Sequence, residues 1–284
     1  MTASHPSRPE SFARLDSTAN LMNSIGNELA GQLRLVSPLG GRRPARPALV
    51  LVAHGSRDPR ALQTVRALRD LIGELRPGLA VHLGHIELNE PLLPDTLAAL
   101  GDTPAVLVPL LLSRGYHIKH DIPAMAATAR VRAHVATPLG PHPLLVETLY
   151  DRLLEAGWPT PMDAATRRAC AVVLAAAGSR DPDAATDTRR TARSLADRLG
   201  VPVVPAYASA ATPTVPAAVR ALAARGRHRV AIASYFTAPG RFATQCAEAA
   251  PWIAADPLGA HPAMARLVLQ RYEESVTTRG ATAA

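Results

Sequence analysis

Lysine, cysteine and aromatic residues are scarce in this chain of 284 residues. The only lysine, Lys119, follows an isoleucine, so the Gly-Lys-Ser/Thr sequence of a phosphate-binding P-loop is absent. No two glycines stand two positions apart, which excludes the GxGxxG loop of dinucleotide-binding folds. The sequence therefore lacks the usual loops for ATP and NAD.

The two cysteines, Cys170 and Cys246, form neither a CxxC motif nor a zinc-ribbon spacing. We expect both to be buried free thiols. No apolar run reaches the ~18 residues that a membrane span needs, and no signal-like stretch opens the sequence. These features predict a cytoplasmic protein without a membrane partner.

Aromatic residues make up only 4% of the chain, so its core must consist mainly of Ala, Val, Leu and Ile. The formal net charge is +8, and an anionic small-molecule substrate would explain this excess. No aromatic interleaving or known motif supports nucleic-acid binding, which we do not expect. Residues 1–46 hold several arginines among Ser, Pro and Gly, a composition that predicts a disordered extension.

An internal repeat organises the rest of the chain. Three pairs of segments recur at a nearly constant offset: Leu49–Pro59 with Val172–Pro182, Asn89–Pro94 with Ala211–Pro216, and Pro138–Pro143 with Pro257–Pro262. Such agreement indicates a duplicated domain of roughly 110–120 residues.

Strand-like apolar runs alternate with helical spacing in both copies. In the first copy we predict strands at Ala48–Ala53, Leu79–Leu88, Ala105–Leu112 and His134–Pro138, and helices at Pro59–Leu75, Leu92–Leu100, Ile122–Val131 and Leu144–Glu155. In the second we predict strands at Cys170–Ala176, Val201–Ala206 and Arg229–Phe236, and helices at Ala184–Leu199, Val215–Ala224 and Ala263–Glu273.

This alternation predicts two tandem, duplicated parallel-sheet α/β domains. The expected parts are the extension 1–46, an α/β domain 47–157, a linker 158–168, a repeat α/β domain 169–275 and a tail 276–284.

Three ionisable residues, His54, Glu87 and His117, follow predicted strands of the first copy. The carboxyl ends of parallel strands meet at one sheet edge, where open α/β folds bind ligands. Two imidazoles and a carboxylate suit a divalent metal, and they also suit general bases. As the alternative, they are hydrogen-bonded or solvated loop residues. His85 is expected to point away from the Glu87 site.

Comparison of the copies favours a functional role for these three residues. At the matching positions the second copy has Ala177, Ser209 and Phe242. The turn Gly55–Pro59, by contrast, is retained as Gly178–Pro182. A role in the fold alone does not predict that the ionisable groups are lost while the turn persists.

Three segments carry a resemblance to a known family: the strand followed by His54-Gly-Ser-Arg57, the segment Glu87–Pro91, and Val108–His117 followed by Asp121-Ile-Pro123. The chain thereby resembles the sirohydrochlorin chelatases, which are ATP-independent class II chelatases. The resemblance implies two α/β domains facing each other across a cleft. It also implies insertion of a divalent metal, Fe2+ or Co2+, into sirohydrochlorin for sirohaem or cobalamin synthesis.

In this reading the metal is a substrate, no cofactor is permanently bound, and His54 and His117 are the active-site histidines. The sequence leaves the metal open among iron, cobalt and nickel, and the oligomeric state open as well. The tetrapyrrole carries many carboxylates, so we expect it to be bound by a polar set: Ser56, Arg57, Arg114, Lys119 and Arg180.

The alternative function is a non-catalytic carrier of metal or tetrapyrrole. A phosphoryl-transfer enzyme with His54 as nucleophile is disfavoured, because Ala53 precedes it where such phosphatases need an arginine.

Overall fold

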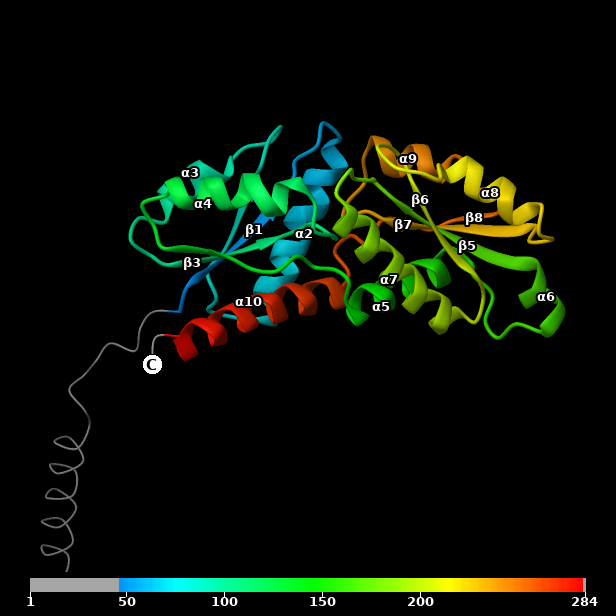
Figure 1. Ribbon diagram of the computed structural model, residues 1–284. Coiled ribbons are helices and arrows are strands. Elements are labelled where there is room, and N and C mark those ends of the chain that lie inside the picture. The colour runs from blue at the N-terminus through cyan, green and yellow to red at the C-terminus, as the bar shows by residue number, and fades with distance from the viewer. Residues whose placement is uncertain (1–45, 283–284) are drawn as a thin grey trace, which may run out of the picture. The chain divides into compact units, whose positions relative to one another are not determined.

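The structure, a computed structural model, describes residues 46–282. The expected extension, residues 1–46, lies outside the described residues except for Arg46. Two parallel four-stranded sheets are present (Figure 1). The first has the order β2-β1-β3-β4 and comprises β1 Ala48–Ala53, β2 Val81–His85, β3 Ala105–Pro109 and β4 Ala133–Val135. The second has the order β6-β5-β7-β8 and comprises β5 Cys170–Ala176, β6 Val203–Tyr207, β7 Arg229–Tyr235 and β8 Ile253–Ala254.

Helices follow the strands in both halves. The first half contains α2 Pro59–Leu75, α3 Leu93–Ala99, the π-helical turn η1 His117–Asp121, α4 Ile122–Thr128 and α5 Pro143–Glu155. The second half contains α6 Ala164–Ala169, α7 Pro182–Leu199, α8 Val215–Ala223, α9 Arg241–Ala247 and α10 Pro262–Thr282. None of these helices combines the length and apolar character that crossing a bilayer requires.

The central strands explain why the sequence folds this way. Every residue of β1 and of β5 is buried, as expected for parallel strands covered on both faces. The pairing is also equivalent: Leu49 lies opposite Val106 in the first sheet, as Val172 lies opposite Ala231 in the second. The prediction of two duplicated parallel α/β domains is therefore confirmed.

Steric constraints explain why both halves keep a glycine in this turn. Gly55 has a φ of +102°, and a Cβ built on it would lie 1.8 Å from the carbonyl oxygen of Glu87. Gly178 has a φ of +93°, and a Cβ built on it would lie 1.8 Å from the carbonyl oxygen of Ser209. Any side chain would clash with backbone at both positions, so glycine is required by the fold in each half.

The last helix of each half packs on the other half (Figure 1). Helix α5 contacts α7 and β7, whereas α10 contacts α2, α5 and β3. The Tyr272 hydroxyl of α10 donates a 2.6 Å hydrogen bond to the carbonyl of Pro47. Residues 276–282, expected as part of a tail, instead continue α10, and α6 begins inside the expected linker and ends one residue beyond it.

Both cysteines are buried and free, as predicted. Burial raises the pKa of the Cys246 thiol to about 11 and also raises that of Cys170. Neither thiol is therefore poised to react at neutral pH.

Candidate active site

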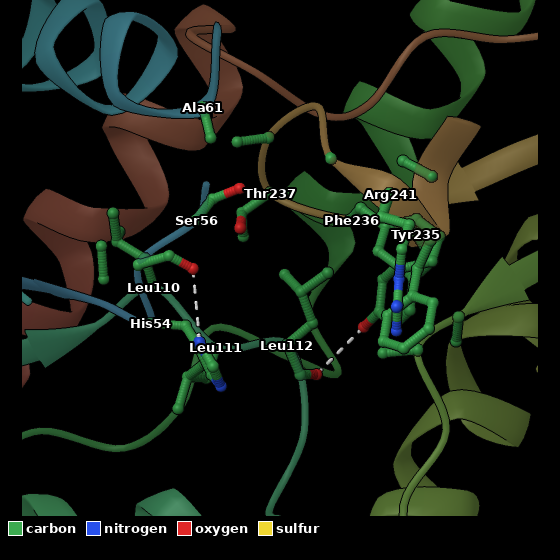
Figure 2. Close-up of a pocket in the computed structure, with 18 of the residues that line it drawn as sticks. His54, Ser56, Ala61, Leu110, Leu111, Leu112, Tyr235, Phe236, Thr237 and Arg241 are labelled. Atoms are coloured by element: carbon green, nitrogen blue, oxygen red, sulfur yellow. Dashed lines mark hydrogen bonds between the residues drawn. The ribbon is translucent and has the colours of Figure 1, made fainter. Parts of the chain in front are cut away.

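A cleft of about 1370 Å³ lies at the carboxyl ends of the central strands and is lined by both halves. Figure 2 shows His54 and Ser56 of the first half facing Phe236 and Arg241 of the second across this space. The volume exceeds the ~300–1,000 Å³ of most small-molecule pockets, so the cleft has room for a large ligand. The expected cleft between the domains is thus present.

The strand ends bring His54 and His117 together. His54 follows β1, and His117 opens η1 after the loop that leaves β3. Their ring centroids are 4.7 Å apart, with the ring planes at 86°. Both side chains are partly exposed to the cleft. At this separation the two rings are in edge-to-face contact, so both imidazoles lie at the same part of the cleft.

The π-helical turn sets the direction of the His117 ring. Asp121 lies one turn further along, and its Oδ2 is 2.6 Å from Nδ1 of His117. The backbone N–H of Ile122 closes the turn on the carbonyl of His117. A carboxylate only accepts hydrogen bonds, so this pairing puts the proton on Nδ1 and leaves Nε2 with its lone pair. Sequence reasoning gave Asp121 no role, although its spacing from His117 was a usable signal.

His54 is held in a similar way. Its Nδ1 lies 3.3 Å from the carbonyl oxygen of Gly55 and 3.6 Å from Oε1 of Glu87. Both neighbours are acceptors, so they favour the Nδ1–H tautomer and free Nε2. The two histidines consequently present the same atom, with its lone pair, to a metal or a proton.

Glu87 is close to the histidines but lies on the Nδ1 side of His54. Among residues 46–282, no group of three or more His, Cys, Asp or Glu side chains is placed to hold a metal ion. The three predicted residues are therefore neighbours, but they do not form a ready three-ligand site. The backbone confirms the match between halves: Glu87 N–H donates to His54 O, and Ser209 N–H donates to Ala177 O.

Only one of the four predicted anion-binding cations, Arg57, lines the cleft. Arg114 and Lys119 instead pair with aspartates of α7 and its N-cap, and Arg180 is not part of the cleft wall. Arg241 of the second half does line it, with its guanidinium carbon 4.8 Å from the ring centroid of Phe242. The sequence analysis missed Arg241 because it predicted no helix at α9, of which Arg241 is the first residue.

Ser56 lines the cleft, but its groups have local partners. Its N–H donates to Asn89 Oδ1 at 2.7 Å, and its Oγ accepts from Asp58 N–H at 3.1 Å. His85 was expected to point away from the Glu87 site unless the strand alternation is broken. His85 is buried and lines the same cleft, with Nδ1 3.1 Å from the carbonyl oxygen of Pro91. Burial lowers the pKa of His85, which keeps its ring neutral.

Fold and site together define a class: a duplicated parallel α/β protein whose cleft holds a pair of histidines from one half only. The chain matches the CbiX family over residues 48–156 and 171–275. It therefore belongs to the CbiX family.

Curated relatives agree with this assignment. The chain is 31% identical over 137 residues to a sirohydrochlorin cobaltochelatase of Methanopyrus kandleri, covering 38% of this chain and 96% of that one. It is 30% identical over 175 residues to a sirohydrochlorin ferrochelatase of Bacillus subtilis, covering 58% of this chain and 64% of that one.

Solved structures share the fold. SirB from Bacillus subtilis with Fe3+ aligns over 83% of this chain and 98% of its own, with a TM-score of 0.65 and 24% identity. SirB from subspecies spizizenii in complex with cobalt aligns over 81% and 94%, with a TM-score of 0.61 and 22% identity.

Proposed function

We propose that this protein is a sirohydrochlorin chelatase, which inserts a divalent metal into sirohydrochlorin without ATP. The substrates are the metal, Fe2+ or Co2+, and the free-base tetrapyrrole. Relatives named as ferrochelatase and as cobaltochelatase support both metals. Iron would commit the product to sirohaem and cobalt to cobalamin. No permanently bound cofactor is needed, because the metal leaves with the product.

The reaction exchanges one cation for two protons: the metal binds four pyrrole nitrogens, and two N–H protons leave. The protein must hold the metal weakly, present it to the ring face and accept protons. His54 and His117 have free Nε2 atoms for both tasks. Glu87, beside Nδ1 of His54, can stabilise the imidazolium that forms when His54 takes a proton.

The second half supplies the opposite wall of the cleft. Phe236 and Phe242 both line it, and their apolar rings suit the face of a macrocycle. Arg57 and Arg241 approach from opposite halves and can bind carboxylates at the rim. Neither has an acidic partner within residues 46–282.

One observation carries the proposal: two adjacent imidazoles, each held through Nδ1, face a cleft large enough for a tetrapyrrole. The test is anaerobic metal insertion followed by the absorbance of the tetrapyrrole. The wild type should turn over many times per active site. His54→Ala and His117→Ala should each lower kcat at least ~100-fold, as expected for loss of a metal-presenting base.

His134→Ala is the matched control, since this exposed histidine of β4 does not line the cleft. It should keep wild-type turnover. A carrier would instead bind the tetrapyrrole stoichiometrically and stop, and that result would overturn the proposal. So would near wild-type insertion by the His54→Ala, His117→Ala double variant.

A further inference from the structure

The loop that carries His117 is tied to the second half by three aspartates of α7 and its N-cap. We call this set the clasp; its members are Arg114 and Lys119 of the loop and Asp181, Asp183 and Asp187 of the second half. The two cations flank His117 in sequence, so the clasp holds the loop on both sides of the candidate catalytic ring.

The inner part of the clasp is the pair Arg114–Asp187. Arg114 donates from Nε to Oδ2 at 3.0 Å, from Nη2 to Oδ1 at 2.7 Å and from its backbone N–H to Oδ2 at 3.1 Å. The Asp187 side chain has 0% exposure, so its charge depends on these donors. A bidentate pair of this kind fixes orientation as well as distance.

The outer part is the only lysine of the chain. Lys119 Nζ lies 2.7 Å from Oδ2 of Asp181 and 2.9 Å from Oδ2 of Asp183. These contacts raise the pKa of Lys119 and lower those of both aspartates. The two aspartates that Lys119 contacts are more exposed than Asp187. We therefore expect the Lys119 ion pairs to be weaker than Arg114–Asp187 and more sensitive to salt.

The clasp exists on one side of the duplicated fold only. The helix α2 matches α7, and there Thr64 stands in place of Asp187 and Arg60 in place of Asp183. In the second-half loop, Pro239 and Thr244 replace Arg114 and Lys119. The second half has thus lost the ionisable residues of the site, and it supplies the anions that hold the loop bearing the remaining histidine.

We propose that Asp187 is a positioning residue for His117. It acts through Arg114 and the loop that carries His117, and Asp181 and Asp183 aid it through Lys119. This inference rests on the proposed function, and it gives Arg114 and Lys119 a positioning role in place of the expected substrate binding. The second half then contributes to turnover by fixing the geometry of the first. A misplacement of about 1 Å at the reacting centre can cost up to ~100-fold in rate.

The kinetic test uses the full chain and two neutral variants. Asp187→Asn should lower kcat about tenfold and leave KM for the tetrapyrrole nearly unchanged. Arg114→Gln should cost more, because it leaves the buried Asp187 carboxylate without its cation. Adding Asp187→Asn to Arg114→Gln should then restore part of the turnover. If Arg114 instead binds substrate, Arg114→Gln will raise KM, the two losses will multiply, and the proposal is overturned.

A second measurement does not depend on activity. Backbone hydrogen exchange over residues 113–121 should speed up at least ~10-fold in Asp187→Asn, because the Arg114 amide loses a charged acceptor. Lys119→Gln should give a smaller increase. Asp197→Asn, an exposed aspartate on the same helix, is the matched control and should change nothing.

Unchanged exchange in Asp187→Asn would overturn the clasp even if the wild type inserts metal. A different outcome is that the wild type fails to insert metal while loop exchange is still faster in Asp187→Asn. That result would overturn the proposed function and leave the clasp in place.

Discussion

At the scale of single residues, the arginines expected near the cleft show which substrate-binding positions the sequence can predict and which it cannot. Arg57 was predicted because it follows the His54 turn, and it does line the cleft. Its counterpart Arg180 was likewise predicted to bind substrate carboxylates, yet it lies outside the cleft wall. Equivalent positions in a duplicated chain need not face the same space, and the sequence alone does not distinguish them.

Substitutions should therefore distinguish the arginines that line the cleft from Arg180, which does not. Arg57→Gln and Arg241→Gln should each raise KM for the tetrapyrrole about three- to tenfold, with little change in kcat, because each removes a charged partner for a substrate carboxylate. Arg180→Gln is the matched control and should leave KM unchanged. Steady-state kinetics at low and high salt provide the measurement. A larger effect for Arg180 than for Arg241 would contradict this assignment of the cleft walls.

The histidine site was predicted in part. His54 and His117 follow buried apolar strands, and parallel strands present their carboxyl ends at one edge, so their proximity could be expected. The partner of Arg114 could not be predicted, because Asp187 is 73 residues away in the chain. Nothing local in the sequence marks that pair. The orientation of His117 likewise depends on a π-helical turn, for which sequence patterns give no clear signal.

At the scale of elements, each half has one histidine at a matching position, and this histidine caps the N-terminus of the last helix of its half. These two helices, α5 and α10, are the exchanged helices, because each packs on the opposite half. His142 is the N-cap of α5, and its Nδ1 accepts from the N–H of Leu144 at 3.1 Å. His261 does the same for α10, accepting from the N–H of Ala263 at 3.2 Å. Only a neutral ring with a lone pair on Nδ1 can do this, and a charged one would also oppose the helix dipole.

These caps predict a pH dependence of stability. Burial lowers the pKa of both rings, with Arg271 adding to the effect at His142 and Arg152 at His261. The unfolded chain therefore binds protons first as pH falls, so stability is full above the unfolded pKa of ~6.5 and declines below it. The free energy of unfolding, measured in urea, should fall between pH 7.5 and 5.5.

The variant that tests this keeps the cap but removes the titration. His142→Asn combined with His261→Asn retains good N-cap side chains, so the pH dependence over this range should become shallower. His228→Asn, at an exposed position, should leave it unchanged. An equally steep decline in the double Asn variant would show that other groups cause it.

Elements with a clear apolar pattern were predictable, including the seven-residue helices α3 and α4, whereas some short elements were not. The runs at β1 and β5 and the periodic helix α2 match their predicted bounds. In contrast, α9 and β8 were missed, because Phe242 is the only large apolar side chain of α9 and two residues are too few to show a period in β8. The end of α10 was missed for a different reason: its apolar positions fade after Tyr272 while the helix continues.

At the scale of the whole molecule, the exchange of α5 and α10 makes the two halves depend on each other. A duplicated sequence predicts two independent domains, each closed by its own last helix. Here α10 follows the second sheet in sequence but packs on α2 and β3 of the first. The reason is not visible in the sequence, since the same apolar helix face would suit either sheet. The described part of the chain should unfold as one cooperative unit.

A reciprocal pair of cavity substitutions tests this arrangement. Leu267 of α10 and Leu149 of α5 are both buried, and replacing either with alanine should cost about 2–5 kcal/mol of unfolding free energy. Native-state hydrogen exchange then locates the damage. Leu267→Ala should lower protection of β1 and β3 in the first sheet, although Leu267 belongs to the second repeat. Leu149→Ala should lower protection of β7 and α7 in the second half. If each substitution instead weakens only the half to which it belongs in sequence, the halves are independent domains, and the exchanged helices do not couple the two walls of the cleft.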